Sequence, residues 1–153
     1  MLPIKIRRQK QLTKVADPKN LSTATFLAPN GPEICSGNPE GKQWFDIMSQ
    51  DNTKIYEGAE KAHKILLKYI EDSLESYNLE KNKYFLVGFS QGTMLALHTA
   101  LRQKCLGIIG YSGALLENGP SYAKVSNKIL LLHGKLDNVV PLNRMENAYK
   151  KLK

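Results

Sequence analysis

The sequence contains few cysteines and histidines, and neither residue type forms a metal-binding pattern. Its two cysteines, Cys35 and Cys105, lack the C-x-x-C spacing of zinc and redox motifs. Isolated cysteines of this kind are typical of reducing compartments. We therefore expect two free thiols and no metal site.

The sequence also lacks a long hydrophobic run. No stretch approaches the roughly 20 apolar residues that a membrane-spanning helix needs. The opening MLPIKIRRQKQLTK is charged and has no apolar centre, so it does not fit a secretory signal. Hydrophobic residues nevertheless make up 42% of the 153 residues, which is enough for the core of one domain. We expect a cytoplasmic protein.

Charge is distributed unevenly along the chain. The formal net charge is +8, and residues 1–20 hold six Lys/Arg against Asp17 alone, a net of +5. Lys150, Lys151 and Lys153 account for the remaining +3, so residues 21–149 are neutral. A basic arm can bind nucleic acid or anionic lipid, but this one has no interleaved aromatics and no recognition motif. We expect a poorly ordered basic segment over 1–20 and no specific nucleic-acid partner.

The apolar pattern predicts alternating strands and helices. Continuous apolar strands separated by helices are typical of an α/β fold, with a mostly parallel sheet covered by helices on both faces. Residues 30–52, rich in glycine and proline before Trp44, read as a loop. The expected strands are 23–29, 84–88, 106–113 and 128–134, and the expected helices are 53–77, 91–103 and a last one that opens at Pro141.

The stretch GFSQG, residues 88–92, lies at the junction of an expected strand and an expected helix. A strand that turns sharply into a helix forces its apex residue toward positive φ and brings the flanking segments close together. Gly88 and Gly92 supply small residues two positions before and two positions after Ser90. This context predicts a nucleophile elbow with Ser90 as the nucleophile; the alternative is a serine in a tight turn.

A serine hydroxyl needs a base, and the base needs an orienting carboxylate. Asp137 lies in the loop after the expected strand 128–134, where an α/β fold presents functional groups. We predict that Asp137 is the acid of a catalytic triad. The alternative is an aspartate that caps a turn or a helix.

Five blocks together resemble the phospholipase/carboxylesterase family of α/β-hydrolases, which includes acyl-protein thioesterases. The resemblance covers about residues 22 to 152, and residues 21–153 would form a partial α/β-hydrolase domain. The blocks, in order, are FLAPNGPE (26–33), WFDI (44–47), GFSQG (88–92), GYSGALL (110–116) and HGKLDNVVP (133–141).

The resemblance implies hydrolysis of small carboxylic esters or thioesters by a Ser-Asp-His triad, without a metal or organic cofactor. It assigns Ser90 as nucleophile, Asp137 as acid and the Gln91 N–H as an oxyanion donor. It also suggests that Trp44 and Phe45 help to wall the acyl site, although large aromatics are commonly core residues.

Two parts of the family pattern are not found. Residues 1–20 contain no H-G-x-G segment, which in the family supplies the second oxyanion N–H, and no histidine follows Asp137. His63, in a polar position of the expected helix, His98, about 12 Å of helix rise from Ser90, and His133, beside Gly134, fit packing or surface roles better. Relative to the family, the chain therefore reads as truncated at both ends and without a catalytic histidine.

Two strands of the family fold are also missing from the pattern, one between 23–29 and 84–88 and one after 128–134. An open apolar sheet edge invites pairing with another chain. Three outcomes stay open: the basic N-terminal segment fills the gap, a partner chain fills it in a homo-oligomer, or the fold is marginal. Three hypotheses stay open: a serine esterase or thioesterase completed from elsewhere, a catalytically silent remnant of one, and a basic-armed binding module without activity.

Overall fold

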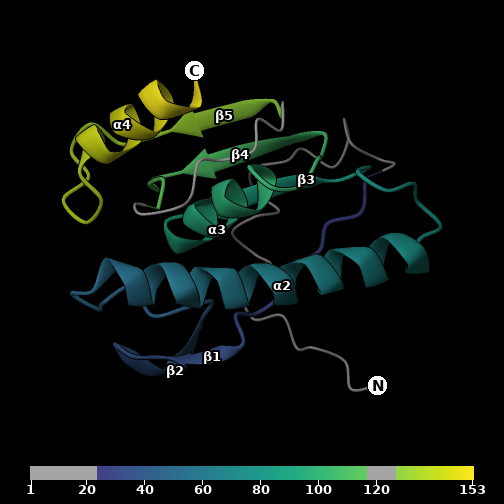
Figure 1. The fold of residues 1–153 in the computed structure, drawn as a ribbon, viewed down its shortest axis with the longest axis horizontal. Coiled ribbons are helices and arrows are strands. Elements are labelled where there is room, and N and C mark those ends of the chain that lie inside the picture. The colour runs from purple at the N-terminus through teal and green to yellow at the C-terminus, as the bar shows by residue number, and fades with distance from the viewer. Residues whose placement is uncertain (1–23, 117–126) are drawn as a thin grey trace.

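The computed structural model describes residues 24–116 and 127–153, and its ribbon is drawn in Figure 1. The predicted basic segment 1–20 lies outside the described residues. No described helix is long and apolar enough to cross a bilayer. The elements, in chain order, are β1 (Glu33–Cys35), β2 (Asn38–Gln43), α2 (Asn52–Ser76), β3 (Phe85–Phe89), α3 (Gln91–Ala100), β4 (Gly107–Tyr111), β5 (Ile129–Leu132) and α4 (Leu142–Leu152).

The centre of the described structure is a parallel sheet in the order β3-β4-β5. Phe89 pairs with Tyr111, and Tyr111 pairs with Leu132, so the three strands end level with one another. The loops that follow these strands therefore begin at one edge of the sheet. The α/β class and the parallel sheet predicted from the sequence are confirmed.

The long helix α2 forms where the sequence predicts it. Asp51 begins it as the N-cap, and its carboxylate accepts a hydrogen bond from the Thr53 N–H at 2.8 Å, which satisfies one of the free donors of the first turn. The predicted apolar stripe is buried at Ala59, Ala62, Leu66 and Ile70. α3 and α4 also match the predicted helices, within one residue at their N-terminal ends; α4 begins at Leu142, with Pro141 as its N-cap.

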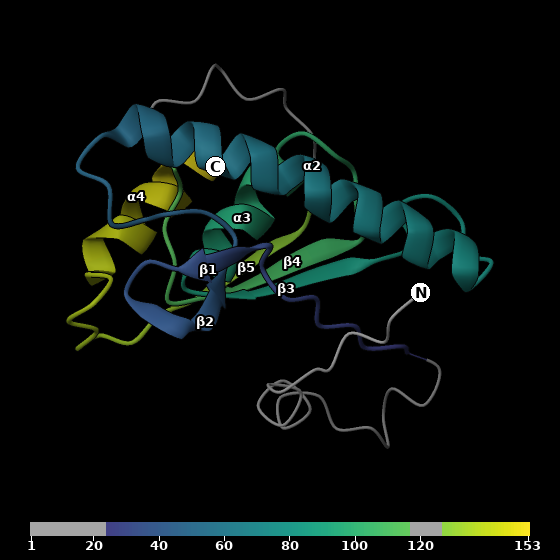
Figure 2. The same ribbon diagram turned by 90° about the horizontal axis from the view of Figure 1, so that it is seen from below.

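All three described helices pack on one face of the sheet. α3 lies against β3 and β4, α2 packs against α3, and α4 lies beside β5 (Figures 1 and 2). Two clusters of buried side chains fill this side. One joins α3, α4 and the helix-facing side of the strands, and the other joins α2 to Phe45 and Leu95.

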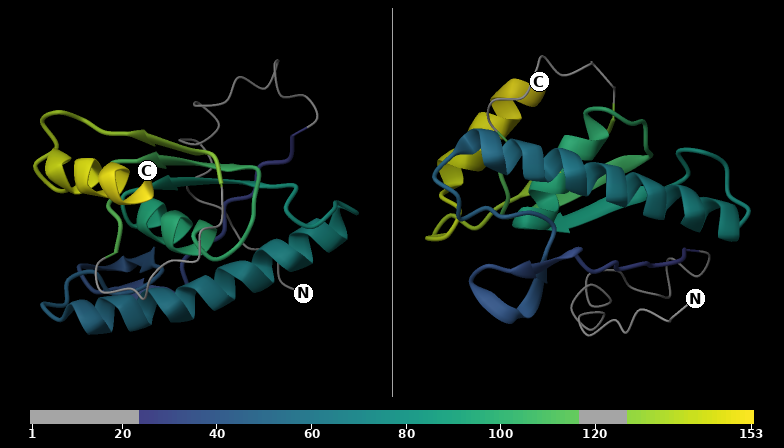
Figure 3. Two further views of the ribbon diagram at one scale, coloured as in Figure 1. Left: turned by 45° about the horizontal axis from the view of Figure 1, so that its top comes forward. Right: turned by 60° about the horizontal axis from the view of Figure 1, so that its bottom comes forward.

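The other face of the sheet is exposed, which corrects the prediction of helices on both faces. Phe85 is 60% exposed, Phe89 69% and Leu130 54%. No described helix covers this face, and no described strand pairs with the outer edge of β3 or of β5 (Figure 3). The strands are apolar on both sides, as a doubly covered sheet requires, but the described residues cover only one side.

The N-terminal part of the described chain also differs from the prediction. Residues 24–29 form no strand, and Phe26 and Leu27 are 46% and 40% exposed. β-forming residues do not make a strand without a neighbour to pair with, and no described strand pairs with this segment. Within the predicted loop 30–52, the antiparallel hairpin of β1 and β2 forms instead.

Candidate active site

Ser90 lies at a strained turn between β3 and α3. Its φ of 51° and ψ of −116° place it outside the ordinary regions for a residue with a side chain. It directly follows Phe89, the last residue of β3, and caps the N-terminus of α3. The sharp strand-to-helix turn with positive φ that the sequence predicts is therefore present.

The two glycines beside Ser90 have different steric roles. A Cβ on Gly88 would lie 2.4 Å from the main-chain carbon of Gly92 and from the nitrogen of Thr93, so no side chain fits there. A Cβ on Gly92 would meet nothing within 4 Å. The close approach predicted for this turn needs a glycine at 88, whereas space alone does not demand one at 92.

The end of β4 holds the turn in place. The carbonyl of Tyr111 accepts hydrogen bonds from the Ser90 N–H and from the Thr93 hydroxyl, each at 2.8 Å. Thr93 itself is 1% exposed, and the bond that its hydroxyl makes is partly buried. Sequence reasoning did not single out Thr93, because a threonine early in a helix is unremarkable without knowledge of the neighbouring strand.

Asp137 lies in the loop that follows β5, and its carboxylate shapes that loop. Its Oδ1 accepts hydrogen bonds from the N–H groups of Val139 and Val140, both at 2.9 Å. Bonds from the Val140 N–H, the Ser112 hydroxyl and the Val139 N–H lower the pKa of the Asp137 carboxyl. The predicted triad acid is thus ionised at neutral pH and also fills the alternative role of a turn aspartate.

The structure brings Ser90 and Asp137 to the same edge of the sheet. Ser90 follows β3 and binds the carbonyl of Tyr111 in β4, and Ser112 follows β4 and donates its N–H to the carbonyl of Leu132 in β5 at 2.9 Å. Ser112, with a φ of 45°, therefore lies between the two, and its hydroxyl is among the groups that lower the pKa of the Asp137 carboxyl. The sequence analysis assigned no role to Ser112. Its position directly after a buried strand could have marked it as a residue at the functional edge of the sheet.

Each of the three histidine rings contacts a group other than Ser90. His63 Nδ1 lies 3.1 Å from Thr99 Oγ1, His98 Nε2 lies 2.9 Å from Glu60 Oε1, and His133 Nε2 lies 3.7 Å from Asp137 Oδ2. The His133 Nε2 is closer to the carbonyl of Val140, at 2.6 Å, and its side chain is fully buried. His63 is 6% exposed, so the polar position predicted for it is wrong: it faces α3.

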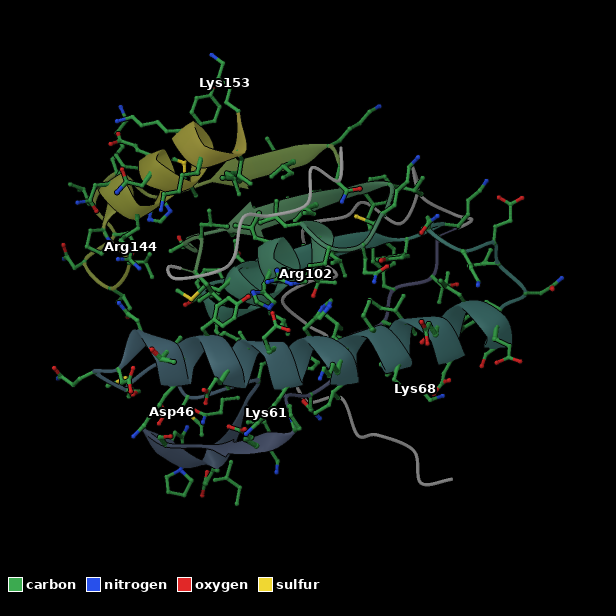
Figure 4. All side chains as sticks on the ribbon, in the orientation of Figure 1. Asp46, Lys61, Lys68, Arg102, Arg144 and Lys153 are labelled. Atoms are coloured by element: carbon green, nitrogen blue, oxygen red, sulfur yellow. The ribbon has the colours of Figure 1, made fainter. Side chains whose placement is uncertain are left out.

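His63 and His98 belong to a polar cluster between α2 and α3. Arg102 donates to Tyr56 Oη at 2.7 Å and lies 2.9 Å from Glu60, and its side chain extends from the end of α3 toward α2 (Figure 4). Burial lowers the pKa of His98 to about 4; Arg102 acts in the same direction, and Glu60 acts against it. These imidazoles are structural groups of a helix interface.

Gln91 joins the turn to the segment that follows β2. Its side-chain oxygen accepts from the Trp44 N–H at 2.8 Å, and its side-chain nitrogen donates to the Phe45 carbonyl at 2.6 Å. The Phe45 side chain is fully buried in the core beside α2, so packing accounts for it and we do not place it in a pocket wall. Trp44 is partly buried beside the same cluster.

The described residues contain no group of three or more His, Cys, Asp or Glu side chains that could hold a metal ion. Cys35 and Cys105 are both unpaired, the first partly buried and the second buried.

Comparison with known proteins agrees with this architecture. A profile of the phospholipase/carboxylesterase family matches residues 9–153. The crystal structure of esterase PE8 is 40% identical, with a TM-score of 0.73 over 83% of this chain and 62% of that one. The crystal structure of a SOBER1 variant from Arabidopsis thaliana is 25% identical, with a TM-score of 0.62 over 87% of this chain and 70% of that one.

A Bacillus cereus carboxylesterase, at 16% identity and a TM-score of 0.67, shares the fold over 80% of this chain and 57% of its own. The chain therefore spans less than two thirds of the length of esterase PE8 and of this carboxylesterase.

Proposed function

Because the chain belongs to the phospholipase/carboxylesterase family, we propose that it carries the nucleophile and the acid of a serine hydrolase that acts on carboxylic esters or thioesters. Ser90 is the nucleophile, Asp137 is the acid, and the Gln91 N–H is an oxyanion donor. The observation that supports this most directly is the strained Ser90, with a φ of 51°, at the strand edge that also carries Asp137. Strained backbone of this kind clusters at active sites.

The reaction follows from these positions. Ser90 Oγ attacks the acyl carbon and passes its proton to an imidazole, and the carbonyl oxygen becomes an oxyanion. Gln91 is the first residue of α3, where an N–H has no acceptor within the helix and can donate to that oxyanion. The imidazole then protonates the leaving alcohol or thiol. Water repeats the sequence on the acyl-serine and releases the acid.

The base is a histidine from polypeptide outside residues 1–153. The three histidines of this chain contact Thr99, Glu60 and the Val140 carbonyl, and the contact of His98 with Glu60 is a close approach of 2.9 Å. The turn bonds of Asp137 use Oδ1, so Oδ2, which lies 3.7 Å from His133 Nε2, can still accept a hydrogen bond. An incoming imidazole would find an ionised carboxylate to orient it.

Free imidazole can test this assignment by standing in for the histidine. The rate of p-nitrophenyl ester hydrolysis by the chain is measured against imidazole concentration, with Ser90→Ala at each concentration as the control for hydrolysis by imidazole itself. We expect a Ser90-dependent rate that rises with imidazole and falls in Asp137→Asn. If the chain and Ser90→Ala stay equal at every concentration, the hydrolase assignment fails for this chain.

The alternative is a catalytically silent remnant of such an esterase, and the engaged histidines are the observation that favours it. A silent remnant would show no Ser90-dependent rate with imidazole. The same titration therefore decides between the two functions.

A further inference from the structure

The side chain of Gln91 makes a contact that only an amide can make. Its oxygen accepts from the Trp44 N–H and its nitrogen donates to the Phe45 carbonyl, across 46 or 47 residues of sequence. A carboxylate could accept from Trp44 but not donate to Phe45, and an apolar side chain could do neither. The two bonds together also fix the orientation of the amide.

The segment that Gln91 holds is itself firmly anchored. Phe45 is fully buried, and a Cβ on Gly58 of α2 would lie 2.9 Å from the Phe45 Cβ, which shows how closely Phe45 approaches the helix. On the opposite side, the turn is held to β4 through the Tyr111 carbonyl. The first turn of α3 is therefore held by two sets of hydrogen bonds. One set joins it to Tyr111 of β4, and the other joins the Gln91 side chain to Trp44 and Phe45.

We propose that the Gln91 side chain is a positioning residue that couples the Trp44–Phe45 main chain to the nucleophile turn. Because the same residue carries the proposed oxyanion N–H, the amide also sets the direction of that N–H. The coupling stands on the two hydrogen bonds, whereas its effect on Ser90 reactivity rests on the proposed hydrolase function. Trp44, the neighbour of the clamped carbonyl, moves with the turn.

The coupling can be measured without catalysis. We expect amide hydrogen exchange at Trp44 to be about tenfold faster in Gln91→Met, which removes the acceptor. Gln91→Glu at neutral pH keeps that acceptor and should keep much of the protection. Unchanged exchange at Trp44 in Gln91→Met would overturn the coupling.

Gln91→Glu should also show a pH-dependent change in Trp44 emission, which a simple loss of side-chain packing would not produce. Its carboxylate faces the Phe45 carbonyl, which favours the neutral acid, so its pKa should lie above the usual 4.3 or so of glutamate. On acidification the neutral acid can both accept from Trp44 and donate to Phe45. Trp44 is the only tryptophan, so its emission should return toward that of the native chain as the pH falls through this pKa.

The controls for the titration are the native chain, Gln91→Met and Gln103→Glu. Gln103 is exposed, so the last variant adds the same charge away from the turn. None of the three should show the transition. If Gln91→Glu unfolds at neutral pH and refolds on acidification, this supports a hydrogen bond donated by the side chain at position 91. If the Trp44 emission of Gln91→Glu matches that of Gln103→Glu at every pH, the donated hydrogen bond is contradicted.

The effect on reactivity is read separately, as the rate at which a fluorophosphonate modifies Ser90 in the presence of imidazole. We expect a loss of about tenfold or more in Gln91→Met relative to the native chain at the same neutral pH and the same imidazole concentration. If the native chain does not react at all, the proposed function fails while the exchange and fluorescence results still decide the coupling. If the native chain and Gln91→Met react equally, the positioning role is wrong.

Discussion

The carbonyl of Tyr111 accepts the N–H of Ser90 at 2.8 Å, so the last residue of one strand holds the turn that follows its neighbour. The same carbonyl binds the Thr93 hydroxyl. The geometry of the turn at Ser90 therefore depends on the β3–β4 pairing. It does not depend on the local sequence GFSQG alone.

A first prediction compares the two glycines of this turn. Gly88→Ala places a Cβ 2.4 Å from main-chain atoms that cannot move aside, and we expect it to lower the free energy of unfolding by about 3 kcal/mol or more. Gly92→Ala has open space and ordinary φ, so it should be neutral or stabilising by up to about 1 kcal/mol. Urea unfolding measures both, and equal effects would contradict the steric account.

A second prediction concerns activity without imidazole. The rings of the three histidines contact Thr99, Glu60 and the Val140 carbonyl, and under the proposed function none of them is the base for Ser90. Removal of a triad member leaves only residual catalysis. We expect the purified chain to hydrolyse a p-nitrophenyl ester no faster than Ser90→Ala and to label weakly with a fluorophosphonate. Robust turnover that Ser90→Ala abolishes would refute this; His→Ala changes at 63, 98 and 133 would then identify the base.

A third prediction concerns pH. The pKa of His98 is about 4 in the folded chain, below the unfolded value of about 6.5, so the unfolded state binds more protons between these limits. The contribution of His98 to the free energy of unfolding is complete above about pH 6.5. It falls by up to about 3 kcal/mol as the pH drops toward 4. Urea unfolding from pH 4 to 7.5 should show this slope, and His98→Gln should reduce it to the part that His63 contributes, since burial also lowers the pKa of His63. An unchanged slope in that variant would assign the effect to other groups.

A fourth prediction concerns the exposed sheet face. Phe85 and Phe89 are 60% and 69% exposed on β3, whose outer edge pairs with no strand among residues 24–116 and 127–153, and this favours self-association. We expect sedimentation to show concentration-dependent association that Phe85→Lys weakens. Leu136, 90% exposed in a loop, offers the matched control, and Leu136→Lys should leave association unchanged. Equal effects of both variants would point to nonspecific hydrophobic contact.

The features that could be predicted from the sequence are those encoded locally. The alternation of apolar strands and helices indicated the α/β sheet, and the glycines and Ser90 indicated the turn. The side chain of Gln91 and the hydroxyls of Ser112 and Thr93 could not be assigned, because their partners lie on other elements far along the sequence. A bond across 47 residues leaves no periodic signal.

The errors in the fold have a similar cause. Residues 24–29 have strand-forming side chains but no described strand to pair with, and the sheet has apolar side chains on both faces but described helices on only one. Composition reports what a segment can pack against. It does not report whether the partner is present.

The length of α2 divides this helix into two parts of unequal stability. Its 25 residues extend about 37 Å, whereas the ten residues of α3 extend about 15 Å, and Figure 2 shows the C-terminal end of α2 reaching beyond α3. The last residue of α2 that is buried is Ile70. The turns after it can open and close locally while the helix interface stays intact. Fraying at that end should therefore not be transmitted to Ser90, and the exchange of amides along α2 should fall into a fast and a slow group that separate near Ile70.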